Sequence, residues 1–169
     1  DQKGILKGVI RPGNIEFSEE MEIEAGKQRD FLLDNTKLKQ LVVRNPALWW
    51  PNGYGEPNLY TCELTYSVGG KVSDRQLLTF GIREYGYEMV DGILHLKING
   101  EPVYLKGGNW GMSEYMLRCR GEEYDLKVKL HQEMNFNMIR NWIGSVTDDE
   151  FYQACDKYGI MVWDDFWLN

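Results

Sequence analysis

One stretch of the sequence limits the fold most strongly: two short apolar runs separated by a helical segment. The runs are Phe136 to Trp142 and Ile160 to Trp163. Between them, Phe151, Cys155 and Tyr158 recur at the i, i+4, i+7 spacing of one helix face. Short continuous apolar runs are typical of parallel strands covered by helices. The stretch therefore predicts a strand–helix–strand unit.

The helical segments carry recognisable faces and ends. Thr147 and Glu150 have the spacing of a capping box at the start of the second helix, and Gly159 is a natural stop. An earlier amphipathic helix is predicted from about Glu122 to Met134. Its apolar side is expected to hold Leu126, Leu130, Met134, Tyr124 and Val128.

A strand before the first helix completes the pattern. Ile93 to Ile98 reads as a strand, Asn99-Gly100 as a hairpin turn, and Pro102 to Lys106 as the return toward Gly107–Trp110. The order strand, helix, strand, helix, strand fits either a doubly wound sheet or the opening of an eight-fold barrel. The glycines of Gly107–Trp110 lack the G-x-G-x-x-G spacing of a dinucleotide site, which argues against a Rossmann domain.

Residues 1–86 show a different pattern, with alternating apolar positions and frequent turn signals. This pattern predicts an antiparallel immunoglobulin-like β-sandwich whose first strand is expected upstream of Asp1. Residues 87–169 then form the second domain. The six strands expected in the sandwich are Gly4–Arg11, one marked by Phe17, Met21 and Ile23, Phe31–Leu33, Leu38–Val43, Leu59–Val68 and Val72–Phe80, the last two joined by Gly69-Gly70.

A loop from Asn45 to Tyr60 carries the adjacent pair Trp49 and Trp50, followed by Pro51. Because proline has no backbone donor, this segment cannot continue a strand ladder. Three interpretations are open at this point. The indoles cover the end of the sandwich, or they form a wedge against a neighbouring domain, or they form a platform on which sugars stack.

The composition of the chain argues against several classes of function. The net charge of −7 argues against a nucleic-acid partner, which requires a basic face. No apolar run approaches the ~20 residues of a membrane span. The three cysteines, Cys62, Cys119 and Cys155, have neither disulfide nor metal spacing and are expected to be small buried apolar residues. We therefore expect no cofactor, no metal and no membrane partner.

Several motifs together resemble one enzyme family. They are Pro46-x-Leu-Trp-Trp-Pro-Asn-Gly-Tyr-Gly55, Phe80-Gly-Ile-Arg-Glu84, Gly108-Asn-Trp110, Met134-Asn-Phe-Asn-Met-Ile-Arg140 and the run from Phe151 to Trp163. In this order they resemble family 2 glycoside hydrolases, in the branch of β-mannosidases, endo-β-mannosidases and exo-β-glucosaminidases. The resemblance implies an immunoglobulin-like domain followed by the first three strands of an incomplete (β/α)8 barrel. It also implies a retaining β-glycosidase that acts on β-mannosides or β-glucosaminides.

The paired aspartates Asp164 and Asp165 invite the interpretation of a catalytic pair, but strand geometry opposes it. Adjacent residues of an extended strand point to opposite faces, so the two carboxylates cannot address one anomeric carbon. The resemblance implies that the acid/base and nucleophile glutamates lie beyond Asn169, and that this chain alone is inactive. The alternative is a non-catalytic sandwich for carbohydrate binding or protein contacts.

Substrate contacts are expected where the barrel strands end, because the carboxyl ends of barrel strands carry function. Aromatic rings there would pack on sugars, and charged groups would bind hydroxyls. The expected substrate-binding residues are Arg140, Trp142, Asp164, Asn109, Trp110 and Asn141. Trp163 is expected in the core, and His131 is expected to be buried and hydrogen-bonded.

Two further expectations concern partners and location. Three barrel strands cannot close, so the fragment is expected to self-associate through the open edge of the sheet. The chain begins at Asp1, so its natural N-terminus is expected to be missing. A periplasmic or secreted location is suspected.

Overall fold

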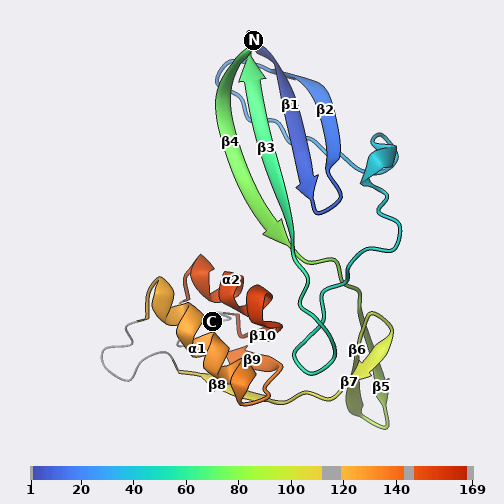
Figure 1. The fold of residues 1–169 in the computed structure, drawn as a ribbon, viewed down its shortest axis with the longest axis vertical. Coiled ribbons are helices and arrows are strands. Elements are labelled where there is room, and N and C mark those ends of the chain that lie inside the picture. Colours follow the sequence, from blue (N-terminus) through green and yellow to red (C-terminus); the bar gives the residue numbers. More distant parts are fainter. Residues whose placement is uncertain (1, 112–118, 143–146, 167–169) are drawn as a thin grey trace. The chain divides into compact units, whose positions relative to one another are not determined.

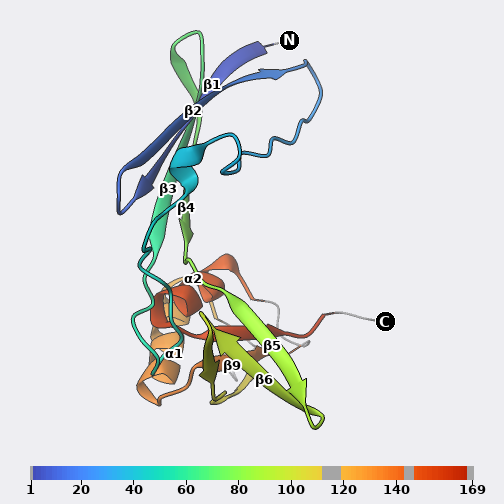
Figure 2. The same cartoon turned by 90° about the vertical axis from the view of Figure 1, so that its right-hand side faces the viewer.

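The computed structural model describes residues 2–111, 119–142 and 147–166 (Figures 1 and 2). It contains two compact units, which are interleaved in the sequence. The first comprises Asp1–Pro46 and Tyr60–Phe80, and the second comprises Ala47–Leu59 and Gly81–Asn169. The Trp49-Trp50 loop therefore belongs with the second unit, and that unit resumes at Gly81, a few residues before the expected boundary at 86.

The first unit is built on one antiparallel sheet of four strands in the order β2-β1-β3-β4. The strands are β1 (Gln2–Arg11), β2 (Ile15–Ile23), β3 (Tyr60–Val68) and β4 (Lys71–Phe80). All four were expected from alternating apolar positions. The β3–β4 turn is the predicted Gly69-Gly70, where both residues adopt positive φ (57° and 78°) at no steric cost. The sheet is consistent with one layer of a β-sandwich.

Two of the strands expected in this unit do not form. Phe31–Leu33 is irregular, and Leu38–Val43 contains only the short 3₁₀ helix Lys39–Leu41. The reason lies between them, where the Asp34 carboxylate accepts hydrogen bonds from the backbone N–H of Thr36 (3.0 Å) and of Lys37 (3.4 Å). A side chain that bonds its own backbone two residues on makes a turn, which competes with an extended ladder.

The second unit contains a parallel sheet of three strands in the order β10-β9-β8. The strands are β8 (Gly107–Trp110), β9 (Met138–Asn141) and β10 (Met161–Asp164), connected through α1 (Glu122–Glu133) and α2 (Asp149–Tyr158). This is the predicted alternation of strands and helices. One register row joins Asn109, Arg140 and Trp163, and the next joins Trp110, Asn141 and Asp164.

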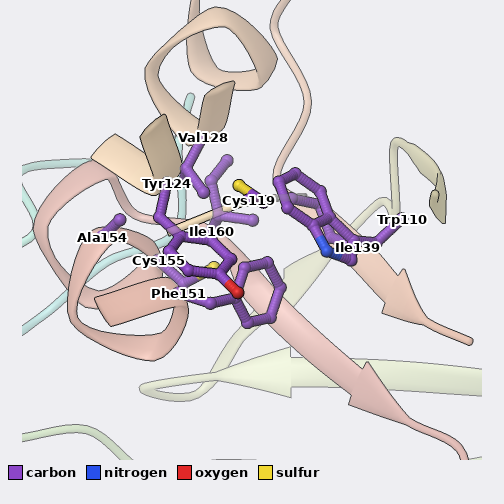
Figure 3. Close-up of a cluster of buried hydrophobic side chains, with 9 residues drawn as sticks. All are labelled: Trp110, Cys119, Tyr124, Val128, Ile139, Phe151, Ala154, Cys155 and Ile160. Carbon is purple, nitrogen blue, oxygen red and sulfur yellow. The ribbon is translucent and has the colours of Figure 1, made fainter. Parts of the chain in front are cut away.

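The two helices cover one face of this sheet, and their shared core is drawn in Figure 3. Its buried members are Trp110, Cys119, Tyr124, Val128, Ile139, Phe151, Ala154, Cys155 and Ile160. From α2, Phe151 and Cys155 point into this core as predicted. All three cysteines are buried and free, which confirms their interpretation as small apolar residues.

The predicted apolar side of α1 is only partly correct. Tyr124 and Val128 are fully buried, whereas Leu126, Leu130 and Met134 are about half exposed. The sheet and α2 contact a stripe of α1 that is narrower than the side assigned from periodicity.

The start of α2 also differs from the prediction. Asp148 is the N-cap residue, and no side-chain capping bond forms there within the described residues. The Thr147 hydroxyl instead lies 3.5 Å from the hydroxyl of Tyr152, and Asp148 accepts a bond from the hydroxyl of Tyr124 (3.2 Å). The helix ends at Gly159 in the left-handed conformation (φ 69°), as predicted.

A second small sheet of this unit has the order β5-β6-β7, from β5 (Tyr85–Val90), β6 (Ile93–Ile98) and β7 (Glu101–Val103). The predicted Asn99-Gly100 turn joins β6 to β7. Strand β5 and its Asp91-Gly92 turn were not expected. Tyr85, Tyr87 and Met89 lie opposite Ile98, Leu96 and Leu94, so one face of the hairpin is apolar.

Trp49 ties the loop from Ala47 to Leu59 into the core of the second unit. Its side chain is fully buried against Ile98, Val103 and Met161. Its indole N–H donates to the backbone carbonyl of Asp156 (2.7 Å). The interpretation that this indole covers the sandwich is therefore wrong, and a fully buried ring offers no platform for a sugar.

Arg83 and Gly81 complete the surroundings of Trp49. The guanidinium of Arg83 lies over the indole, 4.4 Å from the ring centroid, and its Nη1 is 3.7 Å from a carboxylate oxygen of Asp156. A Cβ at position 81 would lie only 2.8 Å from the Cβ of Trp49. The Phe80-Gly-Ile-Arg motif thus provides space for the indole and a cation over its face.

Asn52 in the same loop satisfies backbone groups where both helices end. Its amide donates to the carbonyls of Gln132 and Phe136 (both 2.9 Å), and its backbone N–H donates to the carbonyl of Gly159 (2.8 Å). The last carbonyls of a helix have no partner within that helix. The loop therefore caps α1 and the turn after α2.

Replacing Trp49 by alanine is expected to lower the unfolding free energy of the second unit by about 3–5 kcal/mol, because it empties a fully buried site. Urea denaturation followed by circular dichroism at about 222 nm measures this, since both α-helices of the described chain lie in this unit. Trp163→Ala removes a half-exposed indole and serves as the matched control. Equal losses from the two substitutions would contradict the assigned role of Trp49.

The carboxyl group of Asp156 experiences two opposing effects. Burial raises its pKa above the ordinary value, and the nearby Arg83 guanidinium lowers it, with burial the larger effect. The folded state therefore binds this proton more tightly than the unfolded state does. The resulting contribution to stability is complete below the unfolded pKa and is lost as the pH rises through the folded pKa.

Asp156→Asn, which mimics the protonated side chain, is expected to remove this contribution to the pH dependence. Relative to the variant, the unmodified chain should lose stability as the pH rises above about 3.8, the ordinary pKa of this group. Denaturation curves recorded across the acidic range measure the difference. If the unmodified chain gained stability with pH relative to the variant, attraction by Arg83 and not burial would be the dominant effect.

Candidate functional site

Polar side chains gather at the carboxyl ends of the three parallel strands, and they form two separate rows. Side chains of successive residues in a strand point to opposite faces. Asn109 and Arg140 lie on the face opposite the helices, which is named here the open face. Trp110, Asn141 and Asp164 point toward the helices.

The open-face row is centred on Arg140. Its Nε and Nη2 atoms donate to the two carboxylate oxygens of Asp165 (3.2 and 2.5 Å), and its Nη1 donates to the side-chain oxygen of Asn109 (3.2 Å). A bidentate guanidinium–carboxylate pair has a fixed geometry. The Arg140 side chain is nevertheless 46% exposed to solvent, so it is available to a ligand.

The helix-face row is a polar network centred on Asn141. The Asn141 amide donates to Asp164 (2.8 Å), and it also lies 3.2 Å from the hydroxyl of Thr147 and 3.3 Å from that of Tyr152. Tyr152 donates in turn to Asp164 (3.1 Å). Asn141 is buried, with 6% exposure. This network ties the ends of β9 and β10 to the start of α2.

Trp110 and Tyr124 belong to the same helix side. Trp110 is 3% exposed, and its ring centroid lies 4.9 Å from that of Phe151. Burial raises the pKa of the Tyr124 phenol, which keeps it protonated as the donor to Asp148. These aromatic groups therefore pack on the helix side of the sheet, next to the ends of its strands.

The residues singled out from the sequence are therefore not all brought together. Arg140 and Asn109 contact one another on the open face, whereas Asp164, Asn141 and Trp110 lie on the helix side. Asp165, which sequence reasoning set aside, is the carboxylate that pairs with Arg140. Strand alternation already separated Asp164 from Asp165, but it could not say which one faced the helices.

Two tryptophans complete the described surface near Arg140. Trp142 follows β9 and is 48% exposed, and Trp163 lies beside Arg140 in the register and is 50% exposed. The expectation that Trp163 is a core residue is therefore wrong, because the register places its side chain on the open face. Trp167, at the expected end of the third strand, lies outside the described residues.

His131 is half-buried, with its Nδ1 2.7 Å from the carbonyl oxygen of Lys127, and its ring lies against Trp110 and Phe136. The predicted hydrogen bond is present, and the side chain belongs to the packing of α1.

The open face combines fixed donors and acceptors with the exposed indole ring of Trp163. Such a surface suits a polyhydroxylated ligand, because hydroxyls exchange hydrogen bonds with Asn109, Arg140 and Asp165 while C–H faces pack on indoles. The described parts of the chain hold no group of three or more His, Cys, Asp or Glu side chains arranged for a metal ion. None of the described helices is long and apolar enough to cross a membrane.

Comparison with known proteins defines the class to which this fold and these motifs belong. The pattern of the family described as "Glycosyl hydrolases family 2" matches residues 5–83. Curated relatives match more of the chain than this range, since their alignments cover 70–90% of it. The chain belongs to glycosyl hydrolase family 2.

Two curated relatives illustrate the similarity. The chain is 42% identical over 136 residues to mannosylglycoprotein endo-beta-mannosidase of Lilium longiflorum, covering 78% of this chain and 14% of that protein. It is 35% identical over 122 residues to exo-beta-D-glucosaminidase of Hypocrea jecorina, covering 72% and 14% respectively. The chain thus spans about one seventh of the length of these relatives.

A solved structure with similar architecture is that of the exo-chitosanase of Amycolatopsis orientalis. The TM-score is 0.74 at 26% sequence identity, covering 95% of this chain and 18% of the other.

Replacing Asn141 by alanine is expected to destabilise the second unit by about 1–3 kcal/mol, because the buried network around Asp164 loses its amide donor. Asn109→Ala is the matched control, one register row away and exposed, and should change stability by less than about 0.5 kcal/mol. Urea denaturation of both variants provides the comparison. A larger loss of stability in Asn109→Ala than in Asn141→Ala would contradict the assignment of Asn141 to the buried row and Asn109 to the exposed one.

Proposed function

We propose that this chain is part of a retaining β-glycosidase that cleaves β-mannoside or β-glucosaminide bonds, and that the open face is one wall of its sugar-binding site. The observation that carries the proposal is the row of Asn109, Arg140 and Asp165 at the carboxyl ends of three parallel strands. The half-exposed Trp163 adds aromatic surface beside it in the register, and the half-exposed Trp142 follows β9 directly.

The parallel strands and their helices are proposed to be the opening part of a (β/α)8 barrel. In such barrels the carboxyl ends of the strands carry the active site, and inward-facing residues alternate with residues that face the helices. The adjacent residues Arg140 and Asn141 lie on opposite faces of the sheet, as this alternation requires. The two outer strands, β8 and β10, each have one edge without a strand partner among the described residues. These edges could pair with further strands of the same protein or with a second copy of the chain.

Bond cleavage with retention requires two carboxyl groups about 5–5.5 Å apart on either side of the glycosidic bond. Asp164 is committed to Asn141 and Tyr152 on the helix side, and Asp165 is paired with Arg140 on the other. They do not form such a pair. We therefore propose that the acid/base and nucleophile glutamates are contributed by parts of the complete protein outside this chain, which alone would be inactive.

In this proposal the roles of the expected site residues divide. Arg140, Asn109 and Trp142 contact the sugar, and Asp165 joins them. Asn141, Asp164 and Trp110 hold the strand ends in place. The first unit, with the strands of an immunoglobulin-like sandwich, is a structural support.

A non-catalytic carbohydrate-binding or protein-binding module is not favoured. Such a module has no need for the second unit, where the polar groups converge at strand ends. The names of the relatives, an endo-beta-mannosidase and an exo-beta-D-glucosaminidase, also favour the enzyme.

The test uses the complete protein that contains this chain. Arg140→Ala is expected to lower kcat/KM on an aryl β-mannoside or β-glucosaminide by about 10–100-fold, since charge-assisted hydrogen bonds contribute ~1.5–3 kcal/mol. Arg75→Ala, an exposed arginine of β4, is the matched control and should leave kcat/KM unchanged. The chain of residues 1–169 assayed alone should show no turnover. An undiminished rate in Arg140→Ala, or turnover by the chain alone, would contradict the proposal.

A further inference from the structure

We infer that Asn52 and Asn99 are sites of spontaneous deamidation that the folded second unit protects, and that conversion of either one hinders the unit from refolding. The sequence contains two Asn-Gly pairs, Asn52-Gly53 and Asn99-Gly100, and both lie in this unit. Neither residue takes part in the proposed sugar site.

Deamidation at an Asn-Gly pair needs no enzyme. The backbone nitrogen of the glycine bonds to the side-chain amide carbon, and the side-chain nitrogen leaves as ammonia with the proton of the attacking N–H. Water then opens the resulting five-membered imide at one of its two carbonyls, which gives aspartate or isoaspartate. Glycine favours this ring closure because it has no Cβ to obstruct the close approach. Both pairs are therefore reactive wherever the chain is free to close the ring.

In the folded unit, hydrogen bonds hold the Asn52 side chain in place. Its amide nitrogen donates to the carbonyl oxygens of Gln132 and Phe136, both at 2.9 Å. Its backbone N–H donates to the carbonyl oxygen of Gly159 (2.8 Å). Ring closure turns the amide onto the nitrogen of Gly53 and must break both side-chain bonds. We therefore expect Asn52 to react only when this loop opens.

Asn99 is held in a comparable way. Its side-chain oxygen accepts from the backbone N–H of Glu84 (2.9 Å), and its side-chain nitrogen donates to the carbonyl oxygen of Trp49 (3.0 Å). Its backbone lies in the two-residue turn between β6 and β7, where Asn99 and Gly100 both have positive φ (52° and 84°). Two hydrogen bonds must therefore be lost before the ring can close.

The products do not fit these two positions. An ionised carboxylate only accepts hydrogen bonds, so at position 52 it would face two carbonyl oxygens and leave both without a donor. At position 99 one oxygen could keep the N–H of Glu84, while the other would face the carbonyl of Trp49. Isoaspartate also adds a carbon to the main chain, which disrupts a two-residue turn. Conversion should therefore destabilise the unit at both positions, and more strongly at position 52.

Peptide mapping by mass spectrometry tests the protection. The complete protein that contains this chain is incubated at mildly alkaline pH, either folded or in urea, and the conversion of each asparagine is followed with time. Asn52 and Asn99 should react at least about tenfold more slowly in the folded protein than in urea, because the reaction must wait for local opening.

Asn58 is the matched control in the same loop. Its amide also donates to a backbone carbonyl, that of Leu48 (3.0 Å), but the residue after it is leucine. It should therefore react slowly under both conditions.

Refolding tests the consequence. After dilution from urea, folded and unfolded molecules are separated by size-exclusion chromatography and mapped again, and molecules converted at position 52 or 99 should be enriched among those that fail to refold. Three variants give the order directly. Asn52→Asp should lower the urea midpoint most and Asn99→Asp less, whereas Asn58→Asp adds the same charge at an exposed position and should lower it least. If Asn52→Asp does not fold at all, mapping of the unmodified protein still decides.

Three results would overturn the inference. Equal rates in the folded protein and in urea would show that the hydrogen bonds of Asn52 and Asn99 give no protection. Conversion of Asn58 in urea as fast as that of Asn52 would remove the role of the following glycine. Converted molecules that refold as readily as unconverted ones would show that the carboxylate is tolerated against the carbonyl oxygens. None of these results bears on the proposed glycosidase activity, which is measured separately.

Discussion

The burial of one indole organises the second unit. A buried indole N–H is usually paired with an acceptor, and that of Trp49 donates to the backbone carbonyl of Asp156 in α2, distant in sequence. Its ring meanwhile packs on β6, β7 and β10, and Arg83 covers its outer face. One side chain thus joins a loop, a hairpin, a helix and the parallel sheet. The sheet that carries the polar strand ends depends on this packing at its opposite end.

Asparagine side chains perform a similar task where regular hydrogen bonding stops. Asn137, 1% exposed, donates to the carbonyl of Tyr104 and accepts from the N–H of Lys106. Asn99 links the N–H of Glu84 to the carbonyl of Trp49, while the Asn52 amide donates to two carbonyls at the end of α1. A buried backbone group without a partner is costly, and each amide satisfies two. The short strands of this unit can therefore end abruptly without losing stability.

Local chemistry made much of the fold predictable from the sequence. The Gly69-Gly70 and Asn99-Gly100 turns, the alternating strands and the stop at Gly159 all follow from properties of the residues themselves. The sequence did not reveal which side of each helix or strand is buried. Leu126 and Leu130 lie at helical spacing, yet both remain about half exposed, because the width of the contact stripe depends on what packs against α1. The site was incompletely predicted for the same reason. The alternation of side chains along a strand places Asp164 and Asp165 on opposite faces, but only the neighbouring strands and helices decide which of them contacts Arg140.

The alternation at the strand ends also limits how such a site can change during evolution. Arg140 and Asn141 are adjacent, yet Arg140 lies on the open face and Asn141 holds the start of α2. A substitution at one position leaves the other undisturbed, so specificity can vary while the scaffold persists. An insertion or deletion of a single residue within β9 would exchange the two faces at once, placing the guanidinium among the helices and the amide in the open. If the open face is the sugar-binding wall proposed above, its specificity can change through point substitutions but not through changes in strand length.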